Sequence, residues 1–147
     1  MPKKKTDNRS IGNQFETEMC EILGQHGFWA HNMQQNSSGQ PADIIAIRGA
    51  YHVLIDCKHI AGDKGFPFSQ IRDNQREAMK MFQRRTGQFG YFALKLPDNT
   101  IWLVTLDRMD ILATRGKTRL TVEEIRGGQA WSLEAWLESS KVWAEDT

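Results

Sequence analysis

The sequence predicts one α/β domain in which helices flank a mixed central sheet. Apolar stripes at helical spacing alternate with short apolar runs of period two, in the order helix, hairpin, helix, hairpin, helices. The 147 residues are enough for one hydrophobic core, and their charged fraction of 25% is ordinary for a globular protein. We find no repeat or second domain boundary, so the domain is expected to span residues 11–147.

A flexible basic arm and an amphipathic helix are predicted at the N-terminus. Residues 1–10 are polar and include three consecutive lysines, which is typical of a mobile arm. Residues 11–25 carry an apolar stripe, with Ser10 as a candidate cap and Gly24 or Gly27 as a stop. Glu16 lies at the edge of this stripe, where an acid costs free energy unless it has a partner.

A β-hairpin is predicted over residues 41–59, after a polar loop at 32–40. Gly49 and Ala50 supply a tight reversal between the two apolar runs. Strand alternation places Asp56 and Lys58 on the same face of the second strand. Pairing of the two strands should bring Asp43, at the head of the first, close to Asp56.

A second helix is predicted from a cap at Ser69 to Thr86, with Gly87 as its stop. Gln75 is the polar residue in an otherwise apolar inward stripe. The other members of that stripe are Ile71, Ala78 and Phe82. Basic residues recur every four positions along the opposite side, at Arg72, Arg76, Lys80 and Arg84.

The C-terminal half predicts a further hairpin and three helical segments. The hairpin pairs residues 91–96 with 101–105 around a Pro-Asp-Asn turn. A short helix is expected over 107–114, followed by a basic loop at 116–119. Thr121 and Glu124 form a capping-box pattern, and residues 132–143 form an amphipathic closing helix.

The paired acids of the first hairpin indicate a metal-dependent reaction on phosphate. Two carboxylates held together repel unless a cation lies between them or one keeps its proton. Neighbouring Asp43 and Asp56, with Lys58 two residues on, suit a hard divalent cation and a stabilised phosphate. The pattern therefore predicts a nuclease.

These residues resemble a known nuclease superfamily, PD-(D/E)xK. Its signature is Pro-Asp, a spacer, and then Asp or Glu followed by x-Lys. The chain shows it as Pro41-Ala42-Asp43 and Asp56-Cys57-Lys58. The resemblance implies a restriction-endonuclease-like fold and DNA cleavage.

Within that superfamily the chain looks most like the RecU-type Holliday-junction resolvases. The supporting residues are Gly12 and Glu16, the segment FPFSQIRDNQ at 66–75 and the segment GKTRLTVEEI at 116–125. The resemblance implies a Mg²⁺ site, with Mn²⁺ as a substitute, formed by Asp43, Asp56 and Gln75. Further roles that it implies are transition-state stabilisation by Lys58 and support of the metal shell by Glu16.

Three departures from the family pattern bear on these roles. Asp56 stands where the family usually has glutamate. Pro41 stands where the family has a threonine ligand. The polar loop at 32–40 is shorter than the family's insertion. The resemblance implies that this insertion engages the junction centre, so the shorter loop bears on selectivity for four-way junctions.

DNA binding is expected to depend on local basic patches, because the formal net charge of the chain is only +1. A solvated helix face and a disordered tail are the alternative interpretations of these patches. The candidates are Lys3, Lys4, Lys5 and Arg9 near the N-terminus, Arg72 and Arg76 on the second helix, and Lys117 and Arg119 in the basic loop.

The predicted function is a Mg²⁺-dependent, structure-selective endonuclease that makes paired symmetric nicks in four-way DNA junctions. Two opposed cuts in a twofold junction favour a homodimer. Two alternatives stay open: another nuclease of the same fold, of repair, nicking or restriction type, and a non-catalytic DNA-binding scaffold. We expect no membrane partner and reduced cysteines at Cys20 and Cys57, which suits the cytoplasm of a bacterium or a virus-infected bacterial cell.

Overall fold

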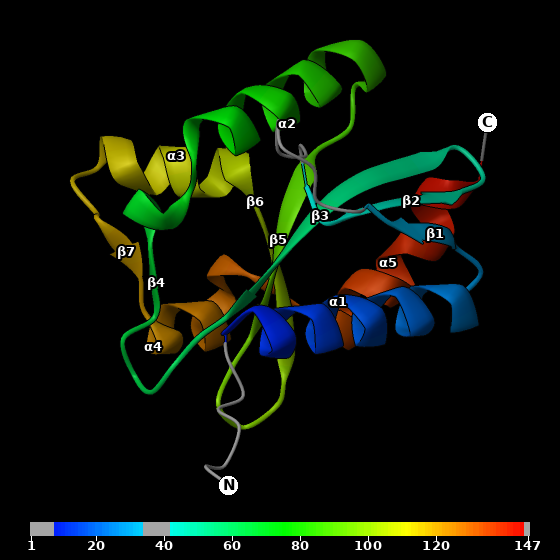
Figure 1. Cartoon of the computed structure of the whole chain (residues 1–147). Coiled ribbons are helices and arrows are strands. Elements are labelled where there is room, and N and C mark those ends of the chain that lie inside the picture. Colours follow the sequence, from blue (N-terminus) through cyan, green and yellow to red (C-terminus); the bar gives the residue numbers. More distant parts are fainter. Residues whose placement is uncertain (1–7, 34–41, 146–147) are drawn as a thin grey trace, which may run out of the picture.

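The structure is a computed structural model, and it describes residues 8–33 and 42–145, with side chains from residue 14 onward in the first range. Figure 1 shows the whole chain. Its elements in order are α1 (Asn8–Gln25), β1 (Trp29–Asn32), β2 (Ile44–Arg48), β3 (Tyr51–His59), β4 (Phe66–Pro67), η1 (Phe68–Gln70), α2 (Asp73–Thr86), β5 (Gly90–Lys95), β6 (Ile101–Thr105), α3 (Leu106–Thr114), β7 (Arg119–Leu120), α4 (Val122–Glu124), η2 (Ile125–Gln129), β8 (Trp131–Ser132) and α5 (Leu133–Ala144).

A mixed six-stranded sheet forms the centre of the domain, in the order β1-β2-β3-β5-β6-β8. The pair β3 and β5 is parallel, and the other neighbours are antiparallel. The helix α2 makes the crossover that a parallel pair requires. The predicted α/β fold with a mixed sheet and flanking helices is therefore confirmed, and so are both predicted hairpins.

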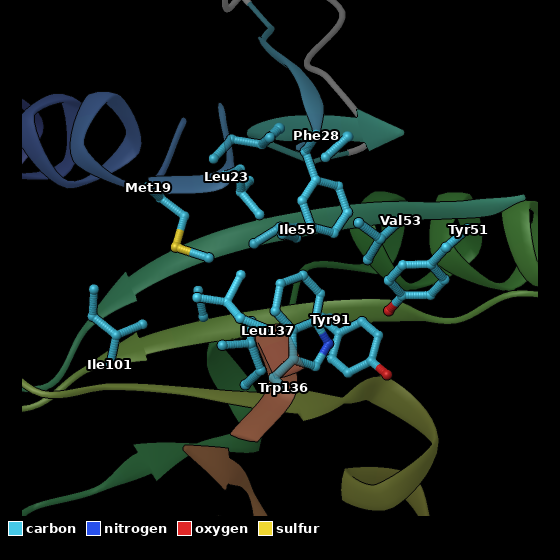
Figure 2. Close-up of a cluster of buried hydrophobic side chains, with 14 of the residues drawn as sticks. Met19, Leu23, Phe28, Tyr51, Val53, Ile55, Tyr91, Ile101, Trp136 and Leu137 are labelled. Atoms are coloured by element: carbon cyan, nitrogen blue, oxygen red, sulfur yellow. The ribbon is translucent and has the colours of Figure 1, made fainter. Parts of the chain in front are cut away.

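Helices cover both faces of this sheet and create two cores. In Figure 1, α1 and α5 lie on one side of the sheet, and α2 and α3 lie on the other. The first core packs α1 and α5 against the sheet, and Figure 2 shows the fully buried Trp136 among its members, with the Phe28 ring stacked on it at a centroid distance of 5.7 Å. The second core includes Met79 of α2 and Met109 of α3. Because β5 contributes alternate residues to both cores, its sequence is a nearly continuous apolar run.

The first helix begins at Asn8, earlier than the sequence predicts. Ser10 therefore lies inside α1 and is not its cap, and part of the segment assigned to the basic arm is helical. Lys3, Lys4 and Lys5 lie outside the described residues. The helix ends at Gln25, and Gly27 follows with a φ of 87°.

The second helix begins later than predicted. A short 3₁₀ turn, η1, contains Ser69, and α2 starts only at Asp73 because Ile71 is extended and buried in the second core. Met79 is a buried residue of α2 that the predicted stripe missed, whereas Gln75 is buried as expected. The helix ends at Gly87, in the left-handed conformation with a φ of 73°.

Four short strands were not predicted: β1, β4, β7 and β8. Strands β4 and β7 form a separate two-stranded sheet that leads into α2. The sheet needs a glycine at position 65, because a Cβ there would lie 2.2 Å from the Leu120 carbonyl oxygen. The other C-terminal predictions are confirmed within one residue for α3 and α5, and the Thr121–Glu124 capping box is present.

Candidate active site

The candidate site lies where β3 extends beyond the start of β2. Ile44 is the first residue of β2 and pairs with Ile55, which leaves the backbone N–H of Cys57 without a partner from that strand. The Asp43 carboxylate accepts this N–H through Oδ2 at 2.8 Å. The Asp43 backbone N–H in turn donates to the Ile55 carbonyl at 3.1 Å. These two bonds hold Asp43 against β3, beside Asp56.

Asp56 is the most buried acid of the site, with 2% of its surface exposed. Its Oδ1 accepts a hydrogen bond from Gln75 Nε2 at 3.2 Å. Its Oδ2 lies 3.1 Å from the Lys58 ammonium and accepts no hydrogen bond from the described residues. A buried carboxylate oxygen with only one cationic neighbour is suited to bind a further positive group.

Gln75 connects Asp56 to the start of α2. Its Oε1 accepts the backbone N–H of Arg72 at 3.2 Å, while its Nε2 points to Asp56. The Arg72 N–H fixes which end of the amide faces the carboxylate, because an N–H donor requires an oxygen. In this arrangement Gln75 positions Asp56, and its carbonyl oxygen is directed away from the two acids.

Three acids come together at the site, and the pKa values of Asp43 and Glu16 are raised there. Burial and the charge of Asp56 raise the pKa of Asp43 to about 8, although the Cys57 N–H opposes the change. Glu16, half-buried on α1, also has a raised pKa, through burial and then the charge of Asp56. Lys58 supplies one positive charge against these acids. With all three acids ionised, the site would hold excess negative charge in a partly buried place.

This donor set fits a hard divalent cation. All the acidic donors are carboxylate oxygens, which Mg²⁺ and Mn²⁺ prefer over nitrogen or sulfur. Among the residues that the structure describes, no three His, Cys, Asp or Glu side chains form a complete metal-binding group. Few protein ligands suffice for Mg²⁺, which keeps several of its waters and contacts phosphate.

Family membership follows from comparison with known proteins. Residues 7–143 match the family model described as archaeal Holliday junction resolvase (Hjc). The chain belongs to this family. The predictions of an endonuclease and of a Holliday-junction-resolving function are thereby confirmed. The model that matches is that of the archaeal resolvases and not a RecU-type one.

Solved structures agree with this membership at the level of the fold. The 1.6 Å structure of Archaeoglobus fulgidus Hjc, a Holliday junction resolvase from an archaeal hyperthermophile, superimposes with a TM-score of 0.64. The match covers 86% of this chain and 98% of that one, at 21% sequence identity. In all, 26 chains of solved structures match. No curated protein sequence matches the chain.

The predicted DNA-binding residues of this family member occupy different environments. Arg72 is exposed at the start of α2, whereas Arg76 forms an ion pair with Asp110 of α3. Lys117 pairs with Glu124, and Arg119 donates to the Lys64 carbonyl at 2.7 Å. Arg9 lies in the first turn of α1, and its side chain is outside the described part of the chain.

Two partners of the predicted site residues were not found from the sequence. The Cys57 backbone N–H anchors Asp43, but a backbone donor has no signal in the residue type. Asp110 holds Arg76, yet an acid on a short surface helix is ordinary in any sequence. Both contacts depend on tertiary structure, since they join residues 14 and 34 positions apart.

None of the helices in the described part of the chain has the length and apolarity needed to cross a bilayer.

Proposed function

We propose that this chain cleaves the phosphodiester backbone of four-way DNA junctions at a site made by Asp43, Asp56 and Lys58. The observation that carries the proposal is the meeting of the Asp43 and Asp56 carboxylates, with Lys58 Nζ 3.1 Å from Asp56. The same geometry supports placement in the PD-(D/E)xK superfamily, because the three residues are those of its signature. The RecU-type likeness depends on residues 66–75, which place Gln75 beside Asp56.

Asp43 and Asp56 are the residues that would hold Mg²⁺ or Mn²⁺. A divalent cation bound there supplies positive charge for the scissile phosphate and lowers the pKa of an attacking water. Asp43 contributes a carboxylate fixed by the Cys57 N–H. Asp56 contributes the buried Oδ2, which no hydrogen bond from the described residues occupies.

Lys58 stabilises the charge that develops on the phosphate. Its ammonium shares a strand face with Asp56 and keeps 21% of its side chain exposed, so it can approach a bound phosphate. A preorganised donor of this kind is typically worth about 3 kcal/mol, or on the order of a hundredfold in rate. Gln75 holds Asp56 in place, and Glu16 adds negative charge that favours cation binding.

The proposed active form is a homodimer. A Holliday junction has two equivalent strands to cut, and two copies related by a twofold axis present two equivalent sites. Association can be measured directly by sedimentation of the full chain. The predicted cellular setting, the cytoplasm of a bacterium or of a virus-infected bacterial cell, stays a prediction.

Cleavage of defined DNA substrates tests the proposal. A labelled four-way junction, a flap and a linear duplex are incubated with the full chain in Mg²⁺, Mn²⁺ or EDTA. We expect paired symmetric nicks in the junction with either metal and none in EDTA. Asp43→Ala and Lys58→Ala should abolish or strongly reduce cleavage while junction binding persists. Glu138→Gln is a matched control, because Glu138 lies on the surface of α5 and pairs only with Lys141 in the described contacts.

Each other outcome supports a different function. Cleavage of all three substrates indicates a less selective nuclease of the same fold. Tight junction binding without cleavage, in the presence of either metal, indicates a DNA-binding scaffold. Full activity of a folded Asp43→Ala variant contradicts the proposed site.

A further inference from the structure

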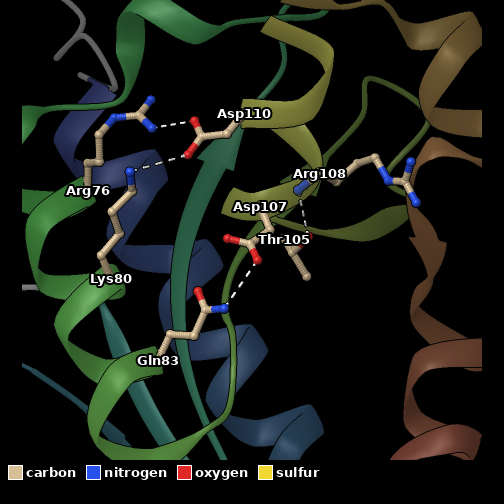
Figure 3. A network of polar contacts seen from close by, with 7 residues as sticks. All are labelled: Arg76, Lys80, Gln83, Thr105, Asp107, Arg108 and Asp110. Atoms are coloured by element: carbon tan, nitrogen blue, oxygen red, sulfur yellow. Dashed lines mark hydrogen bonds and ion pairs between the residues drawn. The ribbon is translucent and has the colours of Figure 1, made fainter. Parts of the chain in front are cut away.

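A group of polar side chains joins α2 to α3 next to the candidate active site. The Arg76 guanidinium contacts the Asp110 carboxylate, and the Lys80 ammonium lies 3.7 Å from its other oxygen. Figure 3 shows both α2 cations directed at this one acid, with the Gln83–Asp107 hydrogen bond one turn farther along. Two positive charges therefore share a single negative charge.

These ion pairs lie at the surface of the protein. The exposed side-chain fractions are 31% for Arg76, 45% for Lys80 and 30% for Asp110. Exposed ion pairs contribute little to folding, because water already solvates both partners. The helices are held together mainly by the second core, through Met79 of α2 and Met109 of α3. The pairs can thus be exchanged without loss of the α2–α3 packing.

The two cations follow Gln75, a residue of the candidate active site, along α2. Gln75, whose amide contacts Asp56 at 3.2 Å, immediately precedes Arg76. Lys80 follows one helical turn later on the same side of α2, since residues four apart are neighbours on a helix surface. Arg76 therefore belongs to the same first turn of α2 as Gln75, with Gln75 directed to Asp56 of β3 and Arg76 directed to Asp110 of α3. Asp110 occupies the position that a DNA phosphate bound by Arg76 would take.

We propose that Asp110 restrains DNA binding by occupying Arg76 and Lys80, and that a backbone phosphate of the substrate replaces it. This inference rests on the proposed function, since it assigns these residues to the DNA path of the same site. Arg76 and Lys80 are phosphate-binding residues, and Asp110 is a positioning residue that acts through them. Its negative charge keeps affinity for DNA moderate and holds the two long side chains in place before substrate arrives.

Removal of the Asp110 charge gives a specific expectation for salt dependence. Each phosphate that a protein neutralises adds about 0.9 to the slope of log affinity against log salt concentration. Asp110→Asn frees about one positive charge, so the slope should steepen by about 0.9. The ratio of variant to wild-type affinity should then grow about 3.5-fold as salt falls from 200 mM to 50 mM.

The experiment measures binding of an uncleaved labelled four-way junction and of a duplex, in EDTA, over a salt series. The variants are Asp110→Asn, Arg76→Gln, Lys80→Gln and Asp110→Asn combined with Arg76→Gln and Lys80→Gln. Asp107→Asn is the matched control, since Asp107 is an α3 acid that accepts from Gln83 and contacts neither cation in the described contacts. We expect Asp110→Asn to bind more tightly with a steeper slope, and both cation variants to bind more weakly. The gain should vanish in the combined variant.

A purely structural ion pair predicts a different result. Asp110→Asn would then lower the melting temperature and leave the affinity and the salt slope at the wild-type values, which overturns the proposal. Unchanged DNA affinity in Arg76→Gln and Lys80→Gln also overturns the proposal. This measurement remains informative even if Asp110→Asn does not fold. If the wild type cuts junctions and Asp110→Asn binds like it, only this inference fails. If Asp110→Asn binds more tightly but the wild type cuts nothing in Mg²⁺ or Mn²⁺, only the proposed function fails.

Discussion

The Asp43 and Asp56 carboxylates lie side by side because Asp43 is hydrogen-bonded to the backbone of Cys57, the residue after Asp56. Burial and the Asp56 charge raise the pKa of Asp43 to about 8. At neutral pH, without a cation, Asp43 therefore keeps its proton. The two carboxylates repel each other when both are ionised. Protonation of Asp43 removes this repulsion, and a bound cation would offset it.

This raised pKa predicts how stability depends on pH in EDTA. Folding raises the pKa of Asp43, so the folded state binds more protons than the unfolded state between about pH 4 and pH 8. The stabilisation is present in full below about pH 4 and is lost as the pH rises through about 8. Between these values the free energy of unfolding falls as the pH rises, with a slope that approaches about 1.4 kcal/mol per pH unit. Urea unfolding at a series of pH values in EDTA measures it.

Asp43→Asn is the control for this pH dependence. The asparagine keeps a neutral carbonyl acceptor for the Cys57 N–H and cannot ionise. We expect the variant to lose most of the slope between pH 5 and pH 8, and to be more stable than wild type at pH 8. A slope unchanged by this substitution would show that Asp43 ionises normally in the folded protein.

Gln75 variants separate a positioning role from a metal-ligand role. Gln75→Glu keeps an oxygen acceptor for the Arg72 N–H but removes the donor to Asp56 and adds a negative charge beside it. If Gln75 positions Asp56, the variant should lose about 1–3 kcal/mol of stability in EDTA. Its cleavage rate at saturating Mg²⁺ should also fall. Denaturant unfolding and single-turnover cleavage over a Mg²⁺ series measure these changes.

A metal-ligand role predicts the opposite for the same variant. A glutamate ligand would strengthen cation binding, so half-maximal cleavage would need less Mg²⁺ with little loss of rate. Gln75→Ala removes both hydrogen bonds and should be less stable than wild type under either role. Only Gln75→Glu adds a negative charge, so a difference in Mg²⁺ requirement between the two variants reports the effect of that charge.

More of the fold than of the site could be predicted from the sequence. The alternation in β3 was enough to place Asp56 and Lys58 on one face, because side-chain direction in a strand follows residue number. The start of α2 was not predictable in this way. Ser69 has the better capping side chain, yet Ile71 enters the second core and Gln75 satisfies the Arg72 N–H instead.

Contacts between distant residues account for the remaining differences. Strands β4 and β7 have two residues each, so neither carries a periodic pattern. The Arg76–Asp110 pair joins two helices whose relative position depends on the whole second core. The even spacing of Arg72, Arg76 and Lys80 indicated a basic helix face, but the acid that faces two of them was not predictable.

We expect the buried tryptophan of α5 to contribute much more to the free energy of unfolding than an exposed tryptophan does. Trp136 is fully buried and packs on Phe28, whereas Trp29 of β1 is 61% exposed. Trp136→Ala should cost about 3–5 kcal/mol of the free energy of unfolding. Trp29→Ala should change it by less than about 0.5 kcal/mol. Denaturant titration followed by circular dichroism measures both, and equal effects would contradict the described core.

Alanine substitutions at two glycines test how β4 is held against β7. The β4 strand precedes α2 in the chain. Gly65 and Gly62 both have positive φ values, 72° and 59°, so an alanine at either position incurs a similar backbone cost of about 1–2 kcal/mol. A Cβ at Gly62 meets no atom within 4 Å, while one at Gly65 would lie 2.2 Å from the Leu120 carbonyl oxygen. Gly65→Ala should therefore destabilise the protein more than Gly62→Ala. Because the displaced segment precedes Gln75, only Gly65→Ala should also slow junction cleavage in Mg²⁺. Single-turnover rates and urea midpoints measure the two effects, and equal midpoints would show that this close approach does not hold β4 to β7.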